Sequence, residues 1–423
     1  MILKLLQTLL VEFQAKYSTM ADPVSRQGHF NHLPNKIDVA IGMRRVGKTY
    51  FLFQTIRDLL MKENIPWHRI LYLNFEDDRL LPCSQKKLVA LLEGFYQLYP
   101  DNHDHTCYFF LDEIQQVDDW PLVIRRFFDT KKIKIYLTGS SARLLSKEIA
   151  SSLRGRSLST EIWPYSFNEY LSAYHMTWDK KHLVSDKIQH KLQEYLRNYF
   201  IQGGFPETIG LPVDKQRQLL QDYVEVVLMR DIIERYNITN ISLIKYLLST
   251  LLKNIATGFS VHKFANDVKS QGLTGAKNTI HDYLSYIEDA YLVFCVPLFS
   301  ESLRKTHSNP RKIYAIDTGL ANAFSFSLQH NSGHLFENIV YLDFRRRGCK
   351  VYYYLTQERC EVDFLVEDPF GHRKLYQVVW DMSDPSTLAR EERALRTAEK
   401  ELGIPGEIIT PEVYMQWVKL EKT

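Results

Sequence analysis

Residues 42–49 read GMRRVGKT, and their types and spacing suit the binding of a nucleoside triphosphate. In such a Walker A loop, Gly42 and Gly47 let successive backbone N–H groups point at phosphate oxygens. The ammonium of Lys48 contacts the β- and γ-phosphates, and the hydroxyl of Thr49 holds Mg²⁺. An ordinary glycine-rich turn has no need of a lysine followed by a threonine. The pattern therefore predicts a site for ATP and Mg²⁺. The residues expected to line the nucleotide are Gly42, Met43, Arg44, Arg45, Val46, Gly47, Lys48, Thr49 and Tyr50.

Two adjacent carboxylates, Asp112 and Glu113, follow the apolar run CYFFL at residues 107–111. A strand that delivers such a pair is the Walker B arrangement. We expect Asp112 to join the Mg²⁺ shell, because a hard cation prefers oxygen ligands. Glu113 can orient the attacking water or accept its proton. A solvated acidic turn would look the same in isolation, but the position downstream of a Walker A loop favours the catalytic pair.

A further apolar run, IKIYLT at residues 133–138, is followed by Gly139, Ser140 and Ser141. Polar groups at the end of a strand beside Walker B can hydrogen-bond the γ-phosphate or the lytic water. We predict this sensor role for Ser140 or Ser141. A serine before a leucine-rich run also makes a good helix N-cap, and the two roles are compatible.

Arg154 and Arg156 flank a glycine in the segment LRGR. Charge that develops during phosphoryl transfer is often stabilised by an arginine from the same or a neighbouring subunit. The hypothesis is that Arg154 or Arg156 is such a finger, and a finger supplied by a neighbour would require a homo-oligomer. The alternative is a solvated basic turn.

Alternating strands and helices must position these residues. Short apolar runs at 37–41, 70–78, 107–113 and 133–141 alternate with helix-forming runs at 51–63 and 87–98. This βαβ alternation predicts a parallel sheet with helices on its faces. The first seventeen residues read as an amphipathic helix, since Lys4, Gln7 and Glu12 interrupt the apolar run and no small-residue cleavage site follows.

The order of motifs resembles that of a known family. The quoted segments are GMRRVGKT, YLNFED, FFLDEIQQVDDW, LTGSSARLLS, LRGR and WPYSFNEYL. This succession is similar to the AAA-type ATPases of bacteria and archaea that carry a C-terminal domain of unknown function. The resemblance covers nearly the whole chain and implies an AAA-like fold. It implies the roles given above for Lys48, Thr49, Asp112, Glu113, Ser140 and Arg156. In that family the C-terminal part resembles a restriction-endonuclease-like core.

The middle of the chain reads as helical, with apolar residues at three- and four-residue spacing over 165–240. We interpret Arg230 and Asp231 there as a surface pair. From 241 to 320, three helices and two strands follow in the order of a winged helix-turn-helix. A DNA-binding version would place the start of the third helix in the major groove. The candidate contacts are Lys277, Asn278, Thr279 and His281, with Lys305, Arg311 and Lys312 near a wing. The alternative is a winged helix that packs on protein, since acidic residues dilute the positive face.

The last hundred residues bear on the implied endonuclease-like core. Such a core needs a helix glutamate, a strand aspartate and a following carboxylate-x-lysine, because the carboxylates gather Mg²⁺. Glu337 and Asp363 fit the first two positions. Gln377 stands where the third carboxylate should be, and Val379 stands where the lysine should be. The sequence therefore predicts a degenerate site that does not cleave nucleic acid.

These readings give an α/β P-loop fold of the AAA type followed by a winged helix and an α+β domain. The predicted parts are an N-terminal helical segment (1–35), the ATPase core (36–165), a helical lid or linker (166–240), the winged helix (241–320) and the endonuclease-like domain (321–423).

Composition narrows the classes of protein that the chain can be. Its 423 residues are too many for one ordinary core, and 45% apolar with 24% charged residues is typical of globular chains. The net charge of +3 confines any nucleic-acid surface to a local patch. Five scattered cysteines without a CxxC pair fit a reducing compartment, so we expect a cytoplasmic protein. No apolar run approaches the roughly 20 residues of a membrane span, and no membrane association is expected.

Two roles for ATP turnover stay open at this stage. In the first, the nucleotide state controls a machine on double-stranded DNA, with Arg345, Arg346 and Arg347 adding phosphate contacts. In the second, the chain is a signalling or assembly switch whose C-terminal domains bind a protein partner. Three arginines at the end of a helix also suit its dipole without any ligand.

Overall fold

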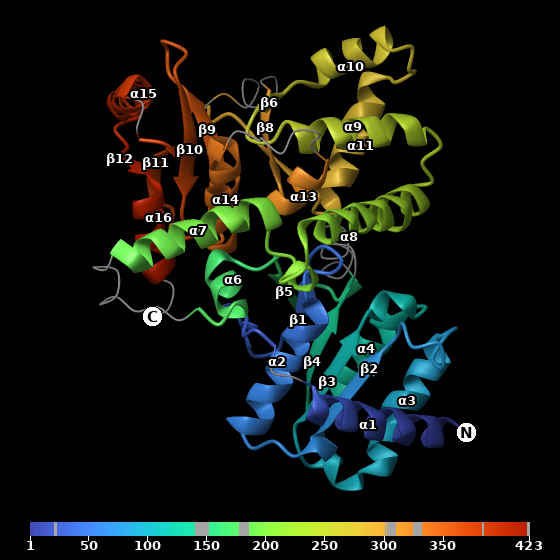
Figure 1. The fold of residues 1–423 in the computed structure, drawn as a ribbon. Coiled ribbons are helices and arrows are strands. Elements are labelled where there is room, and N and C mark those ends of the chain that lie inside the picture. The colour runs from blue at the N-terminus through green and yellow to red at the C-terminus, as the bar shows by residue number, and fades with distance from the viewer. Residues whose placement is uncertain are drawn as a thin grey trace. The chain divides into compact units, whose positions relative to one another are not determined.

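The computed structural model describes residues 1–20, 23–139, 152–176, 186–300, 302, 310–324, 332–382 and 385–420. The chain divides into two compact units, Met1–Ile162 and Trp163–Thr423, each described here by itself (Figure 1). Ser140, Ser141 and Lys305 lie outside the described residues, so their predicted roles stay predictions. The finer division into five parts also stays a prediction.

The first unit is built on a five-stranded parallel sheet with the order β2-β3-β4-β1-β5. Its strands are β1 (Ile37–Ile41), β2 (Ile70–Asn74), β3 (Cys107–Asp112), β4 (Ile133–Thr138) and β5 (Ser157–Glu161). The expected parallel arrangement of β1 to β4 is confirmed. Strand β5 was not expected, because SLSTE has no apolar run. It lies at the edge of the sheet and is half-buried throughout, so polar residues are tolerated.

Helices cover this sheet on its faces. They are α1 (Ile2–Thr19), α2 (Lys48–Met61), α3 (Gln85–Leu98) and α4 (Trp120–Thr130), with single 3₁₀ turns at Trp67–Arg69, Pro100–His103 and Ile114–Gln116. The amphipathic N-terminal helix is present. Leu6 and Leu10 of α1 are buried in the same apolar core as the strands and α3, so this helix is an integral part of the first unit. Apolar burial of this kind contributes roughly 1.5–3 kcal/mol for each large side chain.

The second unit is mostly helical in its first half (green to yellow in Figure 1). Its helices are α6 (Phe167–Ala173), α7 (Asp186–Gln202), α8 (Val213–Val226), the π-helix η6 (Val227–Glu234), α9 (Ile241–Lys253), α10 (Val261–Ser270), α11 (Lys277–Asp289), α13 (Thr318–Phe324), α14 (Ser332–Arg346), α15 (Pro385–Leu402) and α16 (Pro411–Leu420), with a 3₁₀ turn at Pro206–Thr208. The interpretation of Arg230 and Asp231 as a surface pair is wrong, because Asp231 is buried and only Arg230 is exposed.

Two small sheets complete the second unit. The first has strands β6 (Gly258–Phe259), β7 (Val293–Val296) and β8 (Arg311–Ala315) in the antiparallel order β6-β8-β7. The second has strands β9 (Lys350–Leu355), β10 (Glu361–Glu367), β11 (Arg373–Val378) and β12 (Gly406–Ile409) in the order β12-β11-β10-β9, with only the β11–β12 pair parallel.

The second of these sheets is packed on both faces. Ala394, Leu395 and Ala398 of α15 join an apolar cluster with side chains of β10 and β11. Phe344 of α14 makes ring contacts with Phe364 and Tyr376 of the same strands. Helix α14 therefore lies against β10 and β11, which brings Glu337 toward Asp363. Among the helices of the described ranges, none is long and apolar enough to cross a membrane.

Candidate functional site

The Walker A loop leads from β1 into α2 and is held in a compact form. Gly47 has a φ of 97° at the N-cap of α2, a backbone conformation that favours glycine. A Cβ on Gly42 would lie 2.2 Å from the backbone oxygen of Ile162, so only glycine fits there. The buried Lys48 folds back over the loop, with Nζ 3.1 Å from the carbonyl oxygen of Gly42 and 3.0 Å from that of Met43. The loop is thus held by three residues of the motif, Gly42, Gly47 and Lys48.

The remaining predicted nucleotide-lining residues have varied environments. Val46 is buried, Arg44 is half-buried, and Arg45 and Tyr50 are exposed. The guanidinium of Arg44 lies 3.6 Å from the Glu76 carboxylate, which follows β2. The cluster of these residues at one end of the sheet agrees with a phosphate-binding loop, while their individual contacts to nucleotide stay predictions.

The carboxylate of Asp112 gathers three hydroxyl groups. Thr49 Oγ1 donates to it over 2.8 Å and the Tyr72 hydroxyl donates over 2.9 Å. Thr138 Oγ1, at the end of β4, donates to its other oxygen. Burial raises the pKa of the Asp112 carboxyl, and these hydrogen bonds oppose the rise. Walker A and Walker B are therefore joined by a direct side-chain contact, as the sequence predicts for a shared Mg²⁺ ion.

Glu113 is the first residue after β3. Its φ of 54° and ψ of 46° place it in the left-handed region, at the start of the turn Ile114–Gln116. Its backbone N–H donates to Thr138 Oγ1 over 2.9 Å, and its carboxylate accepts a short hydrogen bond from Gln115 Nε2. Two neighbours therefore fix both the backbone and the carboxylate of the predicted catalytic glutamate.

Thr138 is a candidate site residue, whereas the sequence analysis proposed Ser140 or Ser141 for this position. It donates to Asp112 and accepts from Glu113, so it is the contact that links both Walker B residues to β4. The signal that identifies it is the strand order. Because β4 lies between β1 and β3, its C-terminal residue meets both motifs, and this order cannot be read from the chain alone.

Arg26 is a second residue that the motifs did not reveal. Its guanidinium donates to the carbonyl oxygen of Val46 over 2.8 Å, and its backbone N–H donates to Gln54 Oε1 over 2.6 Å. Gln54 of α2 donates in return to the Arg26 carbonyl. Since Arg26 is buried, this pair braces the Walker A loop from the segment that precedes β1.

The residues present suit a bound Mg²⁺ and nucleotide. The Thr49 hydroxyl and the Asp112 carboxylate are hard oxygen donors 2.8 Å apart, which is the donor type that Mg²⁺ prefers. The loop ahead of α2 offers backbone N–H groups at a helix N-terminus, where anions bind favourably. Lys48 donates to carbonyl oxygens that a phosphate oxygen could replace.

The two candidate finger arginines differ. Arg156 is engaged in an ion pair, with Nη1 2.9 Å from Asp129 Oδ2 at the end of α4. Arg154 is exposed and has a φ of 50°. The family resemblance implied the finger role for Arg156. In the structure Arg156 is held in this ion pair, whereas Arg154 is exposed.

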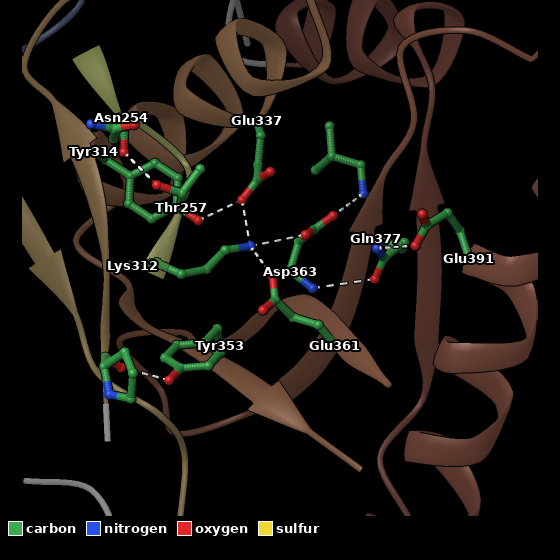
Figure 2. Close-up of polar contacts among 12 residues, drawn as sticks. Asn254, Thr257, Lys312, Tyr314, Glu337, Tyr353, Glu361, Asp363, Gln377 and Glu391 are labelled. Atoms are coloured by element: carbon green, nitrogen blue, oxygen red, sulfur yellow. Dashed lines mark hydrogen bonds and ion pairs between the residues drawn. The ribbon is translucent and has the colours of Figure 1, made fainter. Parts of the chain in front are cut away.

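A lysine cluster forms in the second unit around Lys312, where residues distant in the sequence converge (Figure 2). We use this name for Lys312 of β8, Glu337 of α14, and Glu361 and Asp363 of β10. Lys312 Nζ lies 2.8 Å from Glu337 Oε1, 2.7 Å from Glu361 Oε1 and 3.0 Å from Asp363 Oδ1. The Lys312 side chain is only 3% exposed. The cluster joins three elements that are separate in the sequence.

Charge and burial act against each other in this cluster. Burial and then the neighbouring Asp363 raise the pKa of Glu337 to about 8. Burial lowers the pKa of Lys312, but the charges of Glu337 and its neighbours outweigh that and raise it well above its usual value. The Lys312 side chain therefore carries its positive charge at neutral pH. This charge offsets the cost of burying the neighbouring carboxylates.

The cation of this region comes from a strand outside the expected motif. Val379 does replace the lysine at the expected spacing, but Lys312 from β8 brings an ammonium to the carboxylates instead. The assignment of Lys312 as a DNA contact near a wing is wrong for the same reason. Gln377 is buried beside the cluster, where its Oε1 accepts from the Asp363 N–H and its Nε2 donates to Glu391 over 2.6 Å. In the part of the chain that the structure describes, no group of three or more His, Cys, Asp or Glu is arranged to hold a metal ion.

The arginine run at the C-terminal end of α14 is partly buried inside the second unit. Arg346 donates to Asp343 over 2.5 Å and to the carbonyl oxygen of Pro164 over 3.2 Å. Arg345 lies over the Trp163 ring, and Arg347 over the Trp417 ring. The interpretation of the run as three phosphate contacts is therefore wrong for Arg346, which holds the start of the second unit to its C-terminal part.

The helix α11 keeps its predicted candidates at the surface. Lys277, Asn278 and His281 are exposed and Thr279 is half-buried, all in the first turns of the helix. Arg311, at the start of β8, is half-buried. These residues are accessible to a partner, whereas Lys312 is not.

Comparison with known proteins assigns the family. Residues 34–171 match the AAA domain, and residues 193–330 match a domain of unknown function, DUF8612. The chain is 37% identical to the uncharacterized protein MJ1544 of Methanocaldococcus jannaschii over 387 residues. This alignment covers 90% of this chain and 83% of MJ1544. This chain belongs to the MJ1544 family. A Haemophilus influenzae protein, also described as uncharacterized, is 28% identical over 336 residues, covering 78% of this chain and 80% of its own.

In this member of the MJ1544 family, the AAA match includes every predicted nucleotide-site residue of the first unit. The chain is thus an AAA-type P-loop protein, as the resemblance implied. The DUF8612 match includes Lys312 but ends before Glu337, so the lysine cluster extends beyond that match.

Solved structures are more distant. The Walker-type ATPase PABY2304 of Pyrococcus abyssi is 10% identical, with a TM-score of 0.42, covering 73% of this chain and 99% of that one. The Aeropyrum pernix ORC1 protein, solved in complex with DNA, is 12% identical with a TM-score of 0.28, covering 76% and 91%. With TM-scores under 0.5, neither likeness supports an argument about this chain.

Proposed function

We propose that this protein binds and hydrolyses ATP with Mg²⁺ and that its nucleotide state controls a DNA-associated machine. One observation carries the ATPase assignment. The Thr49 hydroxyl, the Asp112 carboxylate, the Thr138 hydroxyl and the Glu113 N–H form a continuous chain of hydrogen bonds between the two Walker motifs. A turn that binds no ligand does not require these four groups to meet. They meet at the edge where a parallel sheet binds its ligands.

Each residue of this chain has a distinct task. Bound Mg²⁺ would neutralise charge on the β- and γ-phosphates. Thr49 and Asp112 would hold the ion, and Lys48 would exchange its two carbonyl contacts for phosphate oxygens. Glu113 would orient the attacking water, with Thr138 fixing its backbone and Gln115 its carboxylate. An arginine finger, if one acts, would be Arg154 rather than the ion-paired Arg156.

The association with DNA rests on residues 241–315. The order α9-β6-α10-α11-β7-β8, with a sheet ordered β6-β8-β7, is the order expected of a winged helix and supports this part of the proposal. Helix α11 would be its recognition helix, and Lys277, Asn278 and His281 are exposed at its start. This exposure supports contact with a groove or backbone, as a DNA-binding winged helix requires.

The second candidate is an ATP-dependent switch that binds a protein partner through the second unit. The specific observation in its favour is the burial of cations that the sequence offered to DNA. Lys312 and Arg346 pair with internal carboxylates, so neither side chain is available to contact phosphates. This candidate predicts DNA binding that is weak and only slightly dependent on salt.

For residues 321–423 we propose an endonuclease-like core that does not cleave nucleic acid. Gln377 supports this, because its neutral amide lies beside Asp363 and is held by the Glu391 carboxylate. A neutral amide is a poorer ligand for a divalent cation than a carboxylate.

The deciding experiment is steady-state ATP hydrolysis by the purified chain, with and without duplex DNA, at low and moderate salt. Glu113→Gln serves as the blank, and Lys48→Ala as the variant that loses nucleotide. Stimulation by DNA that falls with salt is the expected result. If DNA does not change the rate of ATP hydrolysis, the result favours the switch that binds a protein partner. If both variants still hydrolyse ATP, the ATPase assignment is wrong.

A further inference from the structure

Arg44 belongs to the Walker A loop itself and lies in the turn that follows Gly42. Both sides of this turn are held by contacts with other segments. Gly42 lies against the backbone oxygen of Ile162, and the carbonyl oxygen of Val46 accepts a hydrogen bond from the Arg26 guanidinium. The backbone of Arg44 is therefore fixed beside the predicted phosphate site.

The side chain of Arg44 reaches a carboxylate at the edge of the sheet where Walker B ends. Glu76 comes shortly after β2, and its Oε1 lies 3.6 Å from Arg44 Nη1. The backbone N–H of Glu76 donates to Asn74 Oδ1 over 2.9 Å, and Asn74 is paired with Asp112 across the β2–β3 ladder. The ion pair thus joins the Walker A loop to the segment beside the predicted Mg²⁺ ligand.

The ion pair between Arg44 and Glu76 is one that a stronger anion can replace. Its separation of 3.6 Å exceeds the roughly 2.7–2.9 Å of a charge-assisted hydrogen bond, and the two side chains are 20% and 46% exposed. Ion pairs between partly exposed groups contribute little to stability. A terminal phosphate offers the guanidinium fork two oxygens and more negative charge than a carboxylate. The γ-phosphate of ATP would therefore compete with Glu76 for Arg44.

We propose that Arg44 is a catalytic arginine that the Walker A loop supplies to its own nucleotide, with Glu76 as its partner in the nucleotide-free chain. The proposal rests on the ATP hydrolysis proposed above. When ATP is bound, the guanidinium leaves Glu76 and contacts the γ-phosphate oxygens. Water attacks the γ-phosphorus, the bond to the bridging oxygen breaks with its electron pair passing to ADP, and Glu113 takes the water proton. Arg44 stabilises the negative charge on the phosphate oxygens in this transition state.

The same exchange makes Arg44 a sensor of the γ-phosphate. ADP lacks the group that draws the guanidinium from Glu76, so the ion pair forms again after hydrolysis. The segment after β2 is then joined to the Walker A loop in the ADP state and released from it in the ATP state. This role requires neither Arg154 nor Arg156 and no second subunit. It gives the nucleotide state a structural consequence outside the two Walker motifs.

The test measures kcat and KM for ATP with the full-length chain. It also measures the dissociation constants of ATP and ADP by titration calorimetry in a Glu113→Gln background, which is expected to bind ATP without turnover. Arg44→Ala is compared with Arg44→Lys, with Glu76→Gln and with the double variant of Arg44→Ala and Glu76→Gln. Arg79→Ala is the matched control, because Arg79 also follows β2 but pairs with Asp77 at the surface.

Arg44→Ala is expected to lower kcat on the order of 100-fold, with KM changed less than about threefold. Arg44→Lys should recover part of the rate, because an ammonium cannot bind two oxygens in parallel. ATP should bind about threefold more weakly to Arg44→Ala, whereas ADP should bind as before. Glu76→Gln should tighten ATP binding about threefold, and this gain should be absent when Arg44 is alanine. Arg79→Ala should match the parent in every measurement.

Three results would overturn the proposal. They are a kcat of Arg44→Ala within about twofold of the parent, equal losses of ATP and ADP affinity, and a Glu76→Gln gain that persists without Arg44. Circular dichroism checks each fold, and Arg44→Gln takes the place of Arg44→Ala if that variant is unfolded. Lys48→Ala separates this proposal from the ATPase assignment. Normal turnover in Lys48→Ala would make the nucleotide site itself wrong, whereas an inactive Lys48→Ala beside a normal Arg44→Ala would make only the role of Arg44 wrong.

Discussion

The nucleotide site and the lysine cluster use the same residue types in opposite ways. Around the Walker loop, Lys48, Thr49, Asp112 and Glu113 come from two short motifs, and their acids contact hydroxyl and amide donors. Around Lys312, the acids contact a cation of the chain itself. The first site keeps its charges available for a ligand, whereas the second has already neutralised them.

The comparison shows two different reasons for which a carboxylate can be buried: to bind a ligand or to stabilise the fold. Asp112 is buried with three hydroxyl donors, and in the proposed function Mg²⁺ supplies its counter-charge. Glu337 and Asp363 already have an internal cation, and removing it leaves uncompensated charge. Loss of Lys48 should therefore affect turnover without harming the fold, while loss of Lys312 should affect the fold first.

Lys48→Ala should produce the largest effect. Because it removes the charge that stabilises the phosphates, we expect ATP turnover to fall on the order of 10³-fold or more, with the melting temperature little changed. Steady-state phosphate release and thermal unfolding measure the two quantities. Glu113→Gln is the partner variant, which should still bind ATP. A Lys48→Ala protein that turns over ATP normally would contradict the site assignment.

Lys312→Met should destabilise the second unit by roughly 3 kcal/mol, because removing one partner of a buried ion pair leaves the other charges unpaired. Chemical denaturation of this variant, of Glu337→Gln and of the double variant gives a double-mutant cycle. The double variant should recover part of the loss. Additive losses would show that Lys312 and Glu337 do not stabilise each other.

The sequence predicted the two sites to very different extents. The Walker residues are contiguous and lie at a turn whose geometry the glycines require, so their positions could be inferred before any fold was known. Lys312 is 25 residues from Glu337 and 51 from Asp363, and it was interpreted as a surface contact. Its role depends on β8 lying beside α14 and β10, which no local pattern encodes. Thr138 was missed for a related reason, since only the strand order brings it between Asp112 and Glu113.

Asp38 extends the comparison to a buried acid that forms no ion pair with a lysine or arginine of the described residues. It lies in β1, and His32 Nδ1 lies 3.8 Å from its Oδ2. Burial raises its pKa from 3.8 to about 6. The native state therefore favours the neutral acid. As pH rises from about 4 to 6, the unfolded chain ionises first and stability falls, and above 6 the cost is constant.

Asp38→Asn should thus stabilise the first unit at pH 7 by about 2 to 3 kcal/mol and have little effect at pH 4. Thermal unfolding at both pH values checks this sign. Asp129→Asn is a control, since that carboxylate is at the surface. A gain of equal size at both pH values would show that the effect is not due to ionisation of Asp38.

Thr138→Val tests whether the hydroxyl at the end of β4 serves the nucleotide site. It removes a donor to Asp112 and an acceptor for the Glu113 N–H, so we expect kcat to fall by about tenfold, or about 1.4 kcal/mol. Thr138→Ser keeps the hydroxyl and should retain most of the rate. Thr130→Val, on the exposed end of α4, is the matched control. An unaltered kcat in Thr138→Val would return the sensor role to Ser140 or Ser141.

The smallest effect is expected at Arg156, whose ion pair with Asp129 is 39% and 43% exposed. Surface pairs of this kind contribute less than about 1 kcal/mol, so Arg156→Ala should be nearly neutral for both stability and turnover. Arg154→Ala should lower kcat if Arg154 is the finger. A finger supplied by a neighbouring subunit would also make specific activity rise with protein concentration, and Arg154→Ala should remove that rise. The reverse pattern, with turnover lost in Arg156→Ala alone, would mean that this ion pair opens during catalysis and that an internally neutralised charge can still be recruited to a ligand.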